Sequence, residues 1–153
     1  MADLRIERVQ TPSEKQRFLT FPWKIYRDDP LWVPPLLPER RNQIDPEHSP
    51  FLKRGEADFF LAYQGDQLVG TICAAEDPPT NRNRGTQECV FWFFEYIEDY
   101  EVFQALVETA KDWGRKRGWI DYGCALPGTL YERTKMAAGA SCFRLHRGGQ
   151  PGR

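Results

Sequence analysis

The chain has 153 residues, a hydrophobic fraction of 41% and a formal net charge of −1, which suits one domain with a substantial core. Its 21 basic and 22 acidic residues give no basic excess of the kind that nucleic-acid-binding proteins carry. Because the longest apolar run is too short to span a bilayer and the N-terminus lacks the apolar core of a signal peptide, we expect a cytoplasmic protein that binds neither nucleic acid nor membrane.

The first third of the chain predicts one strand and two helices. Residues 4–9 alternate apolar and charged side chains, which is typical of a short strand. Thr11 and Glu14 have the spacing of a capping box, so a helix is expected to begin there. Pro22 is expected to kink or restart that helix, and residues 36–44 predict a second, short helix.

Three further strands are expected in the middle of the chain. Residues 57–64 and 67–75 predict a hairpin, joined by the two-residue turn Gly65-Asp66. Residues 78–85 are rich in Asn and Arg and predict a polar loop. Residues 86–97 form the most apolar segment, whose near-continuous apolar run predicts a strand buried on both faces.

The strongest helix is predicted over residues 98–117. Its apolar residues recur at helical spacing on one face, with acids at its start and bases at its end, as the helix dipole favours. Gly118 is expected to end it, and a last strand begins at Trp119. The order of elements predicts an α/β fold of the α+β type, with a mixed, mostly antiparallel sheet flanked by helices.

Residues 123–153 differ in composition from residues 1–122. They hold six of the twelve glycines and five basic residues against one acidic residue, and they show no sustained strand or helix period. We therefore expect an ordered portion at 1–122, an atypical basic tail at 123–153 and an incomplete C-terminal half of the fold. The change in composition suggests the hypothesis that the chain is truncated, or its natural reading frame lost, near Tyr122.

Cysteine and histidine spacing argues against common metal and triad chemistry. Cys73 and Cys89 lie inside predicted strands and are expected to be small buried residues, and no cysteines form a closely spaced ligand pair. Neither His48 nor His146 lies beside the residues of a catalytic triad. Phosphate-binding, zinc-protease, hydrolase and dinucleotide motifs are also absent from the sequence, so no metal site is expected.

A proline- and tryptophan-rich segment near the N-terminus is the most distinctive part of the sequence. It runs Phe21-Pro22-Trp23-x-Ile25-Tyr26-x-x-Asp29-Pro30-x-Trp32-Val33-Pro34-Pro35-Leu36. It is followed by Phe60-Leu61-Ala62, by Val69-Gly70-Thr71-Ile72, and by Phe91-Trp92-Phe93-Phe94-Glu95 leading into the long helix. Over residues 18–119 these segments resemble the GNAT acyltransferase superfamily, in particular a group of poorly characterised bacterial members.

The resemblance implies transfer of an acetyl group from acetyl-CoA to the amine of an unidentified small molecule. In that fold, strands four and five diverge from each other, and acetyl-CoA inserts between them. The pantetheine arm would bond the backbone of residues 89–97, and the diphosphate would lie at the start of the following helix, where free N–H groups point at anions. The implied cofactor-binding residues are Phe93, Phe94, Tyr96, Ile97 and Val102.

Glu95 is a lone carboxylate in a strongly apolar strand, which makes it a candidate catalytic base for the amine. The alternative is a strand-end residue that reaches solvent or an arginine. Trp23, Tyr26 and Trp32 are candidates for the wall of an acceptor site, because such sites are often aromatic. Their alternative is a small apolar core that holds the long connection onto the sheet.

The chain departs from the family pattern at the start of the long helix. The superfamily usually places a Gly-rich loop there, whereas this chain has Glu98, Asp99 and Glu101, which would repel a diphosphate. Two functions therefore stay open: an acyl-CoA-dependent N-acyltransferase, and a non-catalytic GNAT-like scaffold or interaction protein that has lost CoA binding. An incomplete sheet would expose an edge, which predicts a homodimer or aggregation.

Overall fold

A computed structural model describes residues 3–85, 88–118 and 121–124. The elements, in chain order, are β1 (Leu4–Arg8), α1 (Pro12–Ile25), α2 (Leu37–Gln43), β2 (Glu56–Gln64), β3 (Gln67–Glu76), α3 (Pro78–Arg84), β4 (Glu88–Tyr96), α4 (Tyr100–Arg115) and β5 (Asp121–Cys124). The strands form one sheet in the order β1-β2-β3-β4-β5; neighbours from β1 to β4 pair antiparallel, and β5 pairs parallel to β4. The predicted mixed, mostly antiparallel α+β fold is confirmed.

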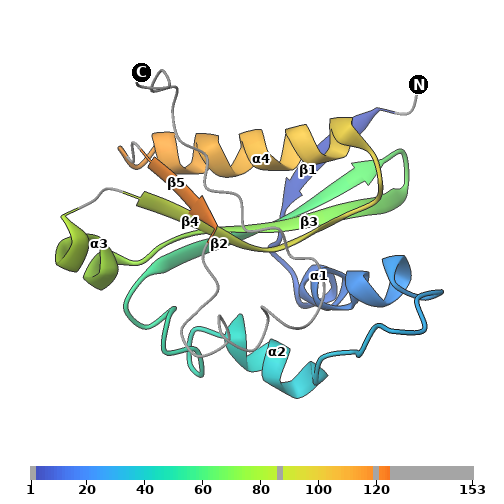
Figure 1. Cartoon of the computed structure of the whole chain (residues 1–153), viewed down its shortest axis with the longest axis horizontal. Coiled ribbons are helices and arrows are strands. Elements are labelled where there is room, and N and C mark those ends of the chain that lie inside the picture. Colours follow the sequence, from blue (N-terminus) through green and yellow to red (C-terminus); the bar gives the residue numbers. More distant parts are fainter. Residues whose placement is uncertain (1–2, 86–87, 119–120, 125–153) are drawn as a thin grey trace, which may run out of the picture.

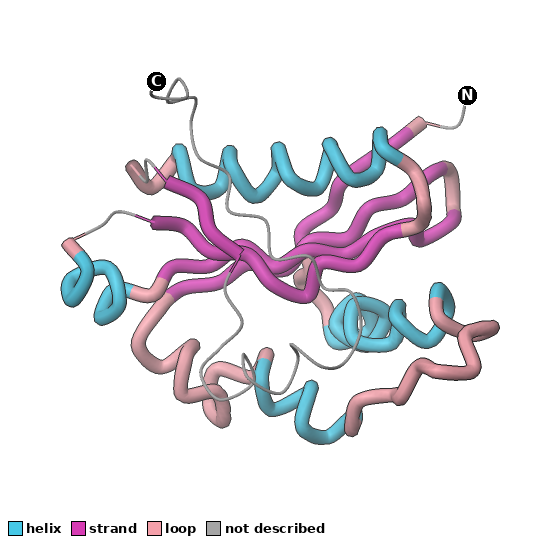
Figure 2. The backbone as a smooth tube through the Cα atoms, viewed as in Figure 1, coloured by secondary structure: helices cyan, strands magenta, loops and turns pink. Residues whose placement is uncertain are grey.

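The sheet lies between two helical layers. Helix α4 runs along one face, while α1 and α2 cover the other (Figure 1). The tube in Figure 2 shows the same layers, with α3 beyond one end of the sheet. Each face of the sheet therefore has its own apolar cluster.

The cluster under α4 is an apolar layer. It consists of Ala62, Val69, Ile72, Ala74, Cys89, Phe91, Val102, Leu106, Ala110 and Trp113. Helix α4 approaches β3 so closely at Gly70 that an added Cβ would lie 2.7 Å from Leu106 Cδ1 and 3.1 Å from Val102 Cγ1. The absence of a side chain at Gly70 is thus what permits this close approach.

The cluster under α1 and α2 is richer in aromatic rings. It consists of Phe18, Leu19, Ile44, Phe51, Phe59, Leu61, Tyr63, Cys73, Ala75 and Trp92. The rings meet edge to face: Phe18 lies 5.3 Å from Phe59, and Phe51 lies 4.5 Å from Trp92, between ring centroids. Such pairs add about 0.5–1.5 kcal/mol beyond the area they bury.

Helix α1 begins as the sequence predicts and ends differently. Thr11 Oγ1 accepts the N–H of Glu14, and the Glu14 carboxylate accepts the N–H of Thr11 in return, which completes the capping box. One helix runs through Pro22 to Ile25, so the alternative of a restart at Pro22 is wrong and the alternative of a kink stays a prediction.

The prediction of a polar loop at residues 78–85 is wrong, since most of this segment is helix α3. Pro78 and Pro79 occupy its first turn, where the missing N–H of proline is tolerated. Gly85 ends the helix with φ of +64°, a left-handed conformation that glycine adopts freely.

Cys73 and Cys89 are free and buried inside strands, as expected. No helix in the described part of the chain is long and apolar enough to cross a membrane. The expected tail at 123–153, the truncation hypothesis and His146 fall almost wholly outside the described residues, so these predictions stay predictions.

Candidate active site

Strand β4 carries one extra residue opposite β3. Thr71 pairs with Glu95 and Cys73 pairs with Trp92, so the ladder advances by two residues on β3 and by three on β4. This is a β-bulge, which leaves backbone groups out of the ladder and re-aims side chains.

The bulge is held in an unusual backbone conformation. Phe93 has φ of +52°, the sole positive φ among the described non-glycine residues. Such a conformation costs about 1–2 kcal/mol, so the surroundings must hold it in place. The buried Thr71 hydroxyl does so, because it donates to the Phe93 carbonyl oxygen at 2.9 Å.

The bulge decides which face of the sheet receives Glu95. Successive strand side chains normally point to opposite faces. Trp92 and Phe93 instead both pack into the cluster under α1 and α2, while Phe94 and Tyr96 pack against the cluster under α4. Glu95 consequently faces α1; strict alternation from Phe91, which lies under α4, would have turned it toward α4.

Glu95 accepts a short hydrogen bond from Tyr26, the residue that follows helix α1. The Tyr26 hydroxyl donates to Glu95 Oε2 at 2.6 Å. Burial raises the pKa of the Glu95 carboxyl above its usual value, and the Tyr26 hydrogen bond and the charge of Arg40 oppose that rise. The site therefore holds a carboxylate that takes up a proton more readily than an exposed one.

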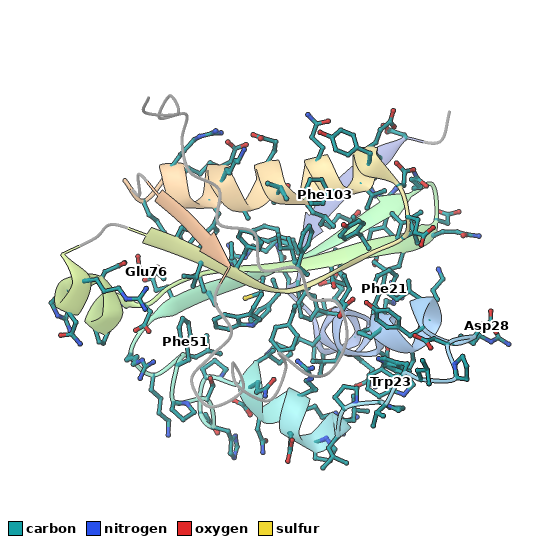
Figure 3. All side chains as sticks on the ribbon, viewed as in Figure 1. Phe21, Trp23, Asp28, Phe51, Glu76 and Phe103 are labelled. Carbon is teal, nitrogen blue, oxygen red and sulfur yellow. The ribbon has the colours of Figure 1, made fainter. Side chains whose placement is uncertain are left out.

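Tyr26 also joins Glu95 to the predicted aromatic wall. Burial, and then the hydrogen bond to Glu95, raise the pKa of Tyr26, so its hydroxyl stays a proton-bearing donor. Its ring stacks on Trp32 at 5.5 Å, and Trp23 meets Trp32 edge-on at 5.4 Å. The structure thus brings together the three candidate substrate residues and the candidate base; Figure 3 labels Trp23 on the α1 and α2 side, across the sheet from Phe103 of α4.

Arg40 of α2 completes this group, and sequence reasoning missed it. Its guanidinium carbon lies 5.1 Å from the centre of the Phe93 ring, at the bulge. Burial lowers the pKa of Arg40, and the charges of Glu95 and Glu39 oppose this. Nothing in the sequence separates Arg40 from the adjacent Arg41, which is exposed and donates to Gln16 Oε1 at 3.2 Å.

The side chains of the expected cofactor residues have varied surroundings. Phe94 and Tyr96 lie 5.6 and 5.5 Å from Phe103 of α4, between ring centroids. The Val102 side chain is fully buried in the cluster under α4, and the Ile97 N–H donates to Val69 O at 3.0 Å. Any contact of Val102 with a cofactor would therefore come from its backbone.

The pairing of β4 with β5 covers the first part of β4. It joins Glu88–Phe91 to Asp121–Cys124, and β4 continues to Tyr96 past the end of the described β5. The bulge lies in that continuing part. The expected parting of the two strands concerns chain beyond Cys124, so it stays a prediction.

The start of α4 is already occupied by a carboxylate of the chain itself. Asp99 is the N-cap: its Oδ1 accepts the N–H of Glu101 at 2.9 Å, and its Oδ2 accepts Gln64 Nε2 at 3.2 Å. Glu98 and Glu101 add two exposed carboxylates. These residues do not fit a diphosphate at this helix end, because the Asp99 carboxylate already uses the Glu101 N–H and the positive end of the helix dipole.

Asp45, Glu47 and His48 offer metal-ligand atoms within 4.8 Å of one another. Asp45 already accepts the N–H of Glu47 at 2.9 Å and lies 2.9 Å from His48 Nδ1, and the group is largely exposed. We assign it no metal.

The chain is similar to two curated bacterial proteins. It is 36% identical over 118 residues to the bacterial ceramide synthase of Caulobacter vibrioides, covering 76% of this chain and 31% of that protein. It is 30% identical over 106 residues to protein YghO of Escherichia coli, covering 69% of this chain and 27% of that protein. The chain thus spans 31% or less of the length of these relatives. A comparison with models of protein families finds none that matches.

Solved structures give the same fold at low sequence identity. A tandem GNAT protein from the clavulanic acid biosynthesis pathway superposes with a TM-score of 0.60 at 14% identity, over 88% of this chain and 43% of that chain. FeeM, an N-acyl amino acid synthase from uncultured soil microbes, gives 0.55 at 14%, over 88% and 77%. A Clostridium acetobutylicum protein described as a predicted acetyltransferase, solved with acetyl-CoA, gives 0.54 at 10%, over 94% and 96%. At these identities the likeness concerns the fold.

Proposed function

We propose that this GNAT-like chain, whose fold is that of the GNAT acetyltransferases, catalyses transfer of an acyl group from a thioester to an amine. The observation that carries the proposal is the β4 bulge, which turns Glu95 toward Tyr26 and the aromatic residues of α1 and the following loop. The name of the ceramide synthase relative supports it, since a ceramide is the amide of an acyl group and a long-chain amine.

Glu95 acts in this proposal as the general base. The acceptor nitrogen attacks the thioester carbonyl carbon, a C–N bond forms, the C–S bond breaks, and the sulfur leaves as a thiolate that takes up a proton. Glu95 accepts the proton that the nitrogen loses, a task for which a raised pKa suits a carboxylate. Tyr26 holds the carboxylate in place, and a β4 amide at the bulge stabilises the oxyanion.

Acetyl-CoA is the donor that the resemblance proposes, and it supplies an activated acyl carbonyl when bound. The thioester arm is proposed to meet β4 around Phe93, because a bulge takes backbone groups out of the ladder; since Thr71 already bonds Phe93 O, the arm would be held by amides of the bulge. The start of α4 does not fit the diphosphate. The donor arm is therefore proposed to lie along β4, with no contribution from the α4 N-terminus.

The test is an acyl-transfer assay on the purified chain with acetyl-CoA, longer acyl-CoAs and a panel of amines. The readouts are the amount of free thiol released and the mass of the product. Glu95→Gln is expected to lower kcat by about 10²–10⁴-fold, the usual contribution of a general base. Glu47→Gln, an exposed acid in the loop after α2, is the matched control and should keep full activity. Absence of product with every donor would refute the function; full activity of Glu95→Gln would refute the role of Glu95.

A second candidate is a non-catalytic scaffold that has lost CoA binding. The Asp99 cap at the start of α4 favours it, because that carboxylate takes the place a diphosphate would need. A thermal-shift titration with acetyl-CoA separates the two candidates. A Tm that rises at micromolar ligand supports the transferase, whereas no shift at millimolar ligand supports the scaffold. Size-exclusion chromatography with light scattering of the same sample tests the predicted homodimer.

A further inference from the structure

We propose that Arg40 binds an anionic group on the acceptor, so that the acceptor is a zwitterionic amine with a carboxylate or a phosphate near its nitrogen. This rests on the proposed function, and it names the substrate class and a specificity-determining residue for it. Arg40 and Glu95 then divide the work, with the guanidinium holding the anion and the carboxylate facing the ammonium group.

The first observation is that Arg40 has hydrogen-bond donors to spare. A guanidinium offers five N–H donors. Among the residues that the structure describes, the Arg40 guanidinium forms a cation–π contact with Phe93 and no hydrogen bond or ion pair, while the Arg40 backbone N–H donates to Leu36 O. Arg41, Arg54 and Arg117 all donate to side-chain oxygens.

The second observation is that Arg40 is partly withdrawn from water. Its side chain has intermediate exposure, and burial is the main cause that lowers its pKa. A charge withdrawn from water without partners is costly, and the contact with an aromatic face at 5.1 Å offsets part of that cost. An anion that meets the free edge of the guanidinium would supply the missing hydrogen bonds.

The third observation is the place of Arg40 beside the proposed base. The guanidinium covers Phe93, which lies two residues before Glu95, and both side chains face α1 and α2. The charge of Glu95 acts on the pKa of Arg40 and the charge of Arg40 acts on that of Glu95, as expected of groups that lie near each other. The guanidinium and the carboxylate thus present a positive and a negative charge that match the two ends of a zwitterionic acceptor.

The neighbouring groups do not neutralise this pair. Tyr26 donates to Glu95 and is neutral, and Trp23 and Trp32 add apolar ring surface. Glu39, the other acid that acts on Arg40, is exposed, so water screens its charge. The positive charge of Arg40 is therefore available to a ligand.

The experiment compares acceptors in matched pairs under the acyl-transfer assay. One pair is an α-amino acid and its primary amide; the other is an aminoalkyl phosphate and the corresponding amino alcohol. For the wild type, we expect KM to be lower for the anionic member of at least one pair. The pair that shows this difference identifies whether Arg40 binds a carboxylate or a phosphate. Arg40→Gln should raise that KM by about 10–100-fold, the effect of losing a charge-assisted hydrogen bond, and leave the neutral partner within about twofold.

Two further variants separate recognition from packing and from net charge. Arg40→Lys keeps the charge and the contact with Phe93 but loses the planar fork, so its KM should fall between wild type and Arg40→Gln. Arg41→Gln removes the same charge from the next residue of α2 and should leave every KM within about twofold. Equal effects of Arg40→Gln and Arg41→Gln, or equal wild-type KM values within both pairs, would overturn the proposal.

A binding measurement keeps the two proposals distinguishable. Acceptors are titrated into the protein without donor, and tryptophan fluorescence reports binding near Trp23 and Trp32. If no acceptor is acylated, the proposed function fails, yet saturable binding of an anionic amine to wild type and its loss in Arg40→Gln would still support the role of Arg40. No preference for the anionic amine in this titration would overturn it.

Discussion

The face of the sheet under α4 and the face under α1 and α2 are made by the same strands, yet they hold different chemistry. The buried cluster under α4 is apolar except at Trp113, whose indole N–H donates to Asp58 at 2.7 Å and whose ring contacts the Arg117 guanidinium. The other face adds a buried threonine, a carboxylate, a phenol and a guanidinium to its aromatic cluster. The comparison teaches that the charged groups under α4, Asp58 and Arg117, contact Trp113 and each other, whereas on the other face the Arg40 guanidinium has no hydrogen-bond partner among the described residues.

The two faces differ because of a local irregularity of β4 as well as composition. The bulge at Phe93 moves Glu95 across the sheet, and Thr71 holds that bulge from the neighbouring strand. Substitutions in the buried cluster under α4 should therefore change stability, whereas substitutions at Glu95, Tyr26 and Arg40 should change chemistry with smaller changes in stability.

The largest effect on stability is expected from the α4 face. Leu106 is fully buried against Gly70, so Leu106→Ala should lower the free energy of unfolding by about 2–5 kcal/mol, measured by urea denaturation. Leu31→Ala is the matched control, because Leu31 is 86% exposed, and it should change stability by less than about 0.5 kcal/mol. Equal effects of the two would contradict the assignment of this cluster as the core.

A smaller loss is expected at the bulge. Thr71→Val removes the hydroxyl that bonds Phe93 O and keeps the shape of the side chain, so unfolding should become about 1–3 kcal/mol easier and acyl transfer slower. Thr109→Val is the control: its hydroxyl also bonds a backbone carbonyl, Ala105 O at 2.8 Å, on α4 away from the bulge. If both variants keep full activity, the bulge does not position the site.

Glu95→Gln should show a pH-dependent gain in stability. The folded-state pKa of Glu95 lies above the usual value of 4.5 for a glutamate, so the wild type loses stability relative to the variant as pH rises from about 4.5 through the folded pKa. The difference in Tm, variant minus wild type, should grow over that range and then stay constant, as thermal unfolding at several pH values would measure. A difference that shrinks with rising pH would show the opposite shift.

The smallest and most specific effect is expected from Tyr26→Phe. The Tyr26 hydroxyl lowers the pKa of Glu95, so its removal should raise that pKa and move the acid limb of the kcat/KM profile to higher pH. Tyr100→Phe, an exposed ring on α4, should leave the limb in place. If the acid limb of Tyr26→Phe stays at the wild-type pH, the group that titrates in that limb is not Glu95.

Much of the architecture follows from local signals in the sequence. The capping box at Thr11, the Gly65-Asp66 turn and the apolar face of the long helix predicted α1, the β2–β3 hairpin and α4. Helix α3 was missed because its Asn and Arg content resembles a loop, although two prolines in a first turn and a glycine after the end also fit a short helix.

The residue types at the candidate site were readable in advance, because a lone Glu95 in an apolar strand and the tryptophans of the proline-rich segment stand out from their surroundings. Their meeting was decided by tertiary structure. Alternation alone would have placed Glu95 under α4. Arg40 and Arg41 of α2 are indistinguishable in the sequence, but in the structure Arg40 lies over Phe93 and Arg41 is exposed. The β4 bulge and the burial of the Arg40 side chain depend on contacts between residues far apart in the chain, such as Thr71 with Phe93. No short stretch of sequence encodes such contacts.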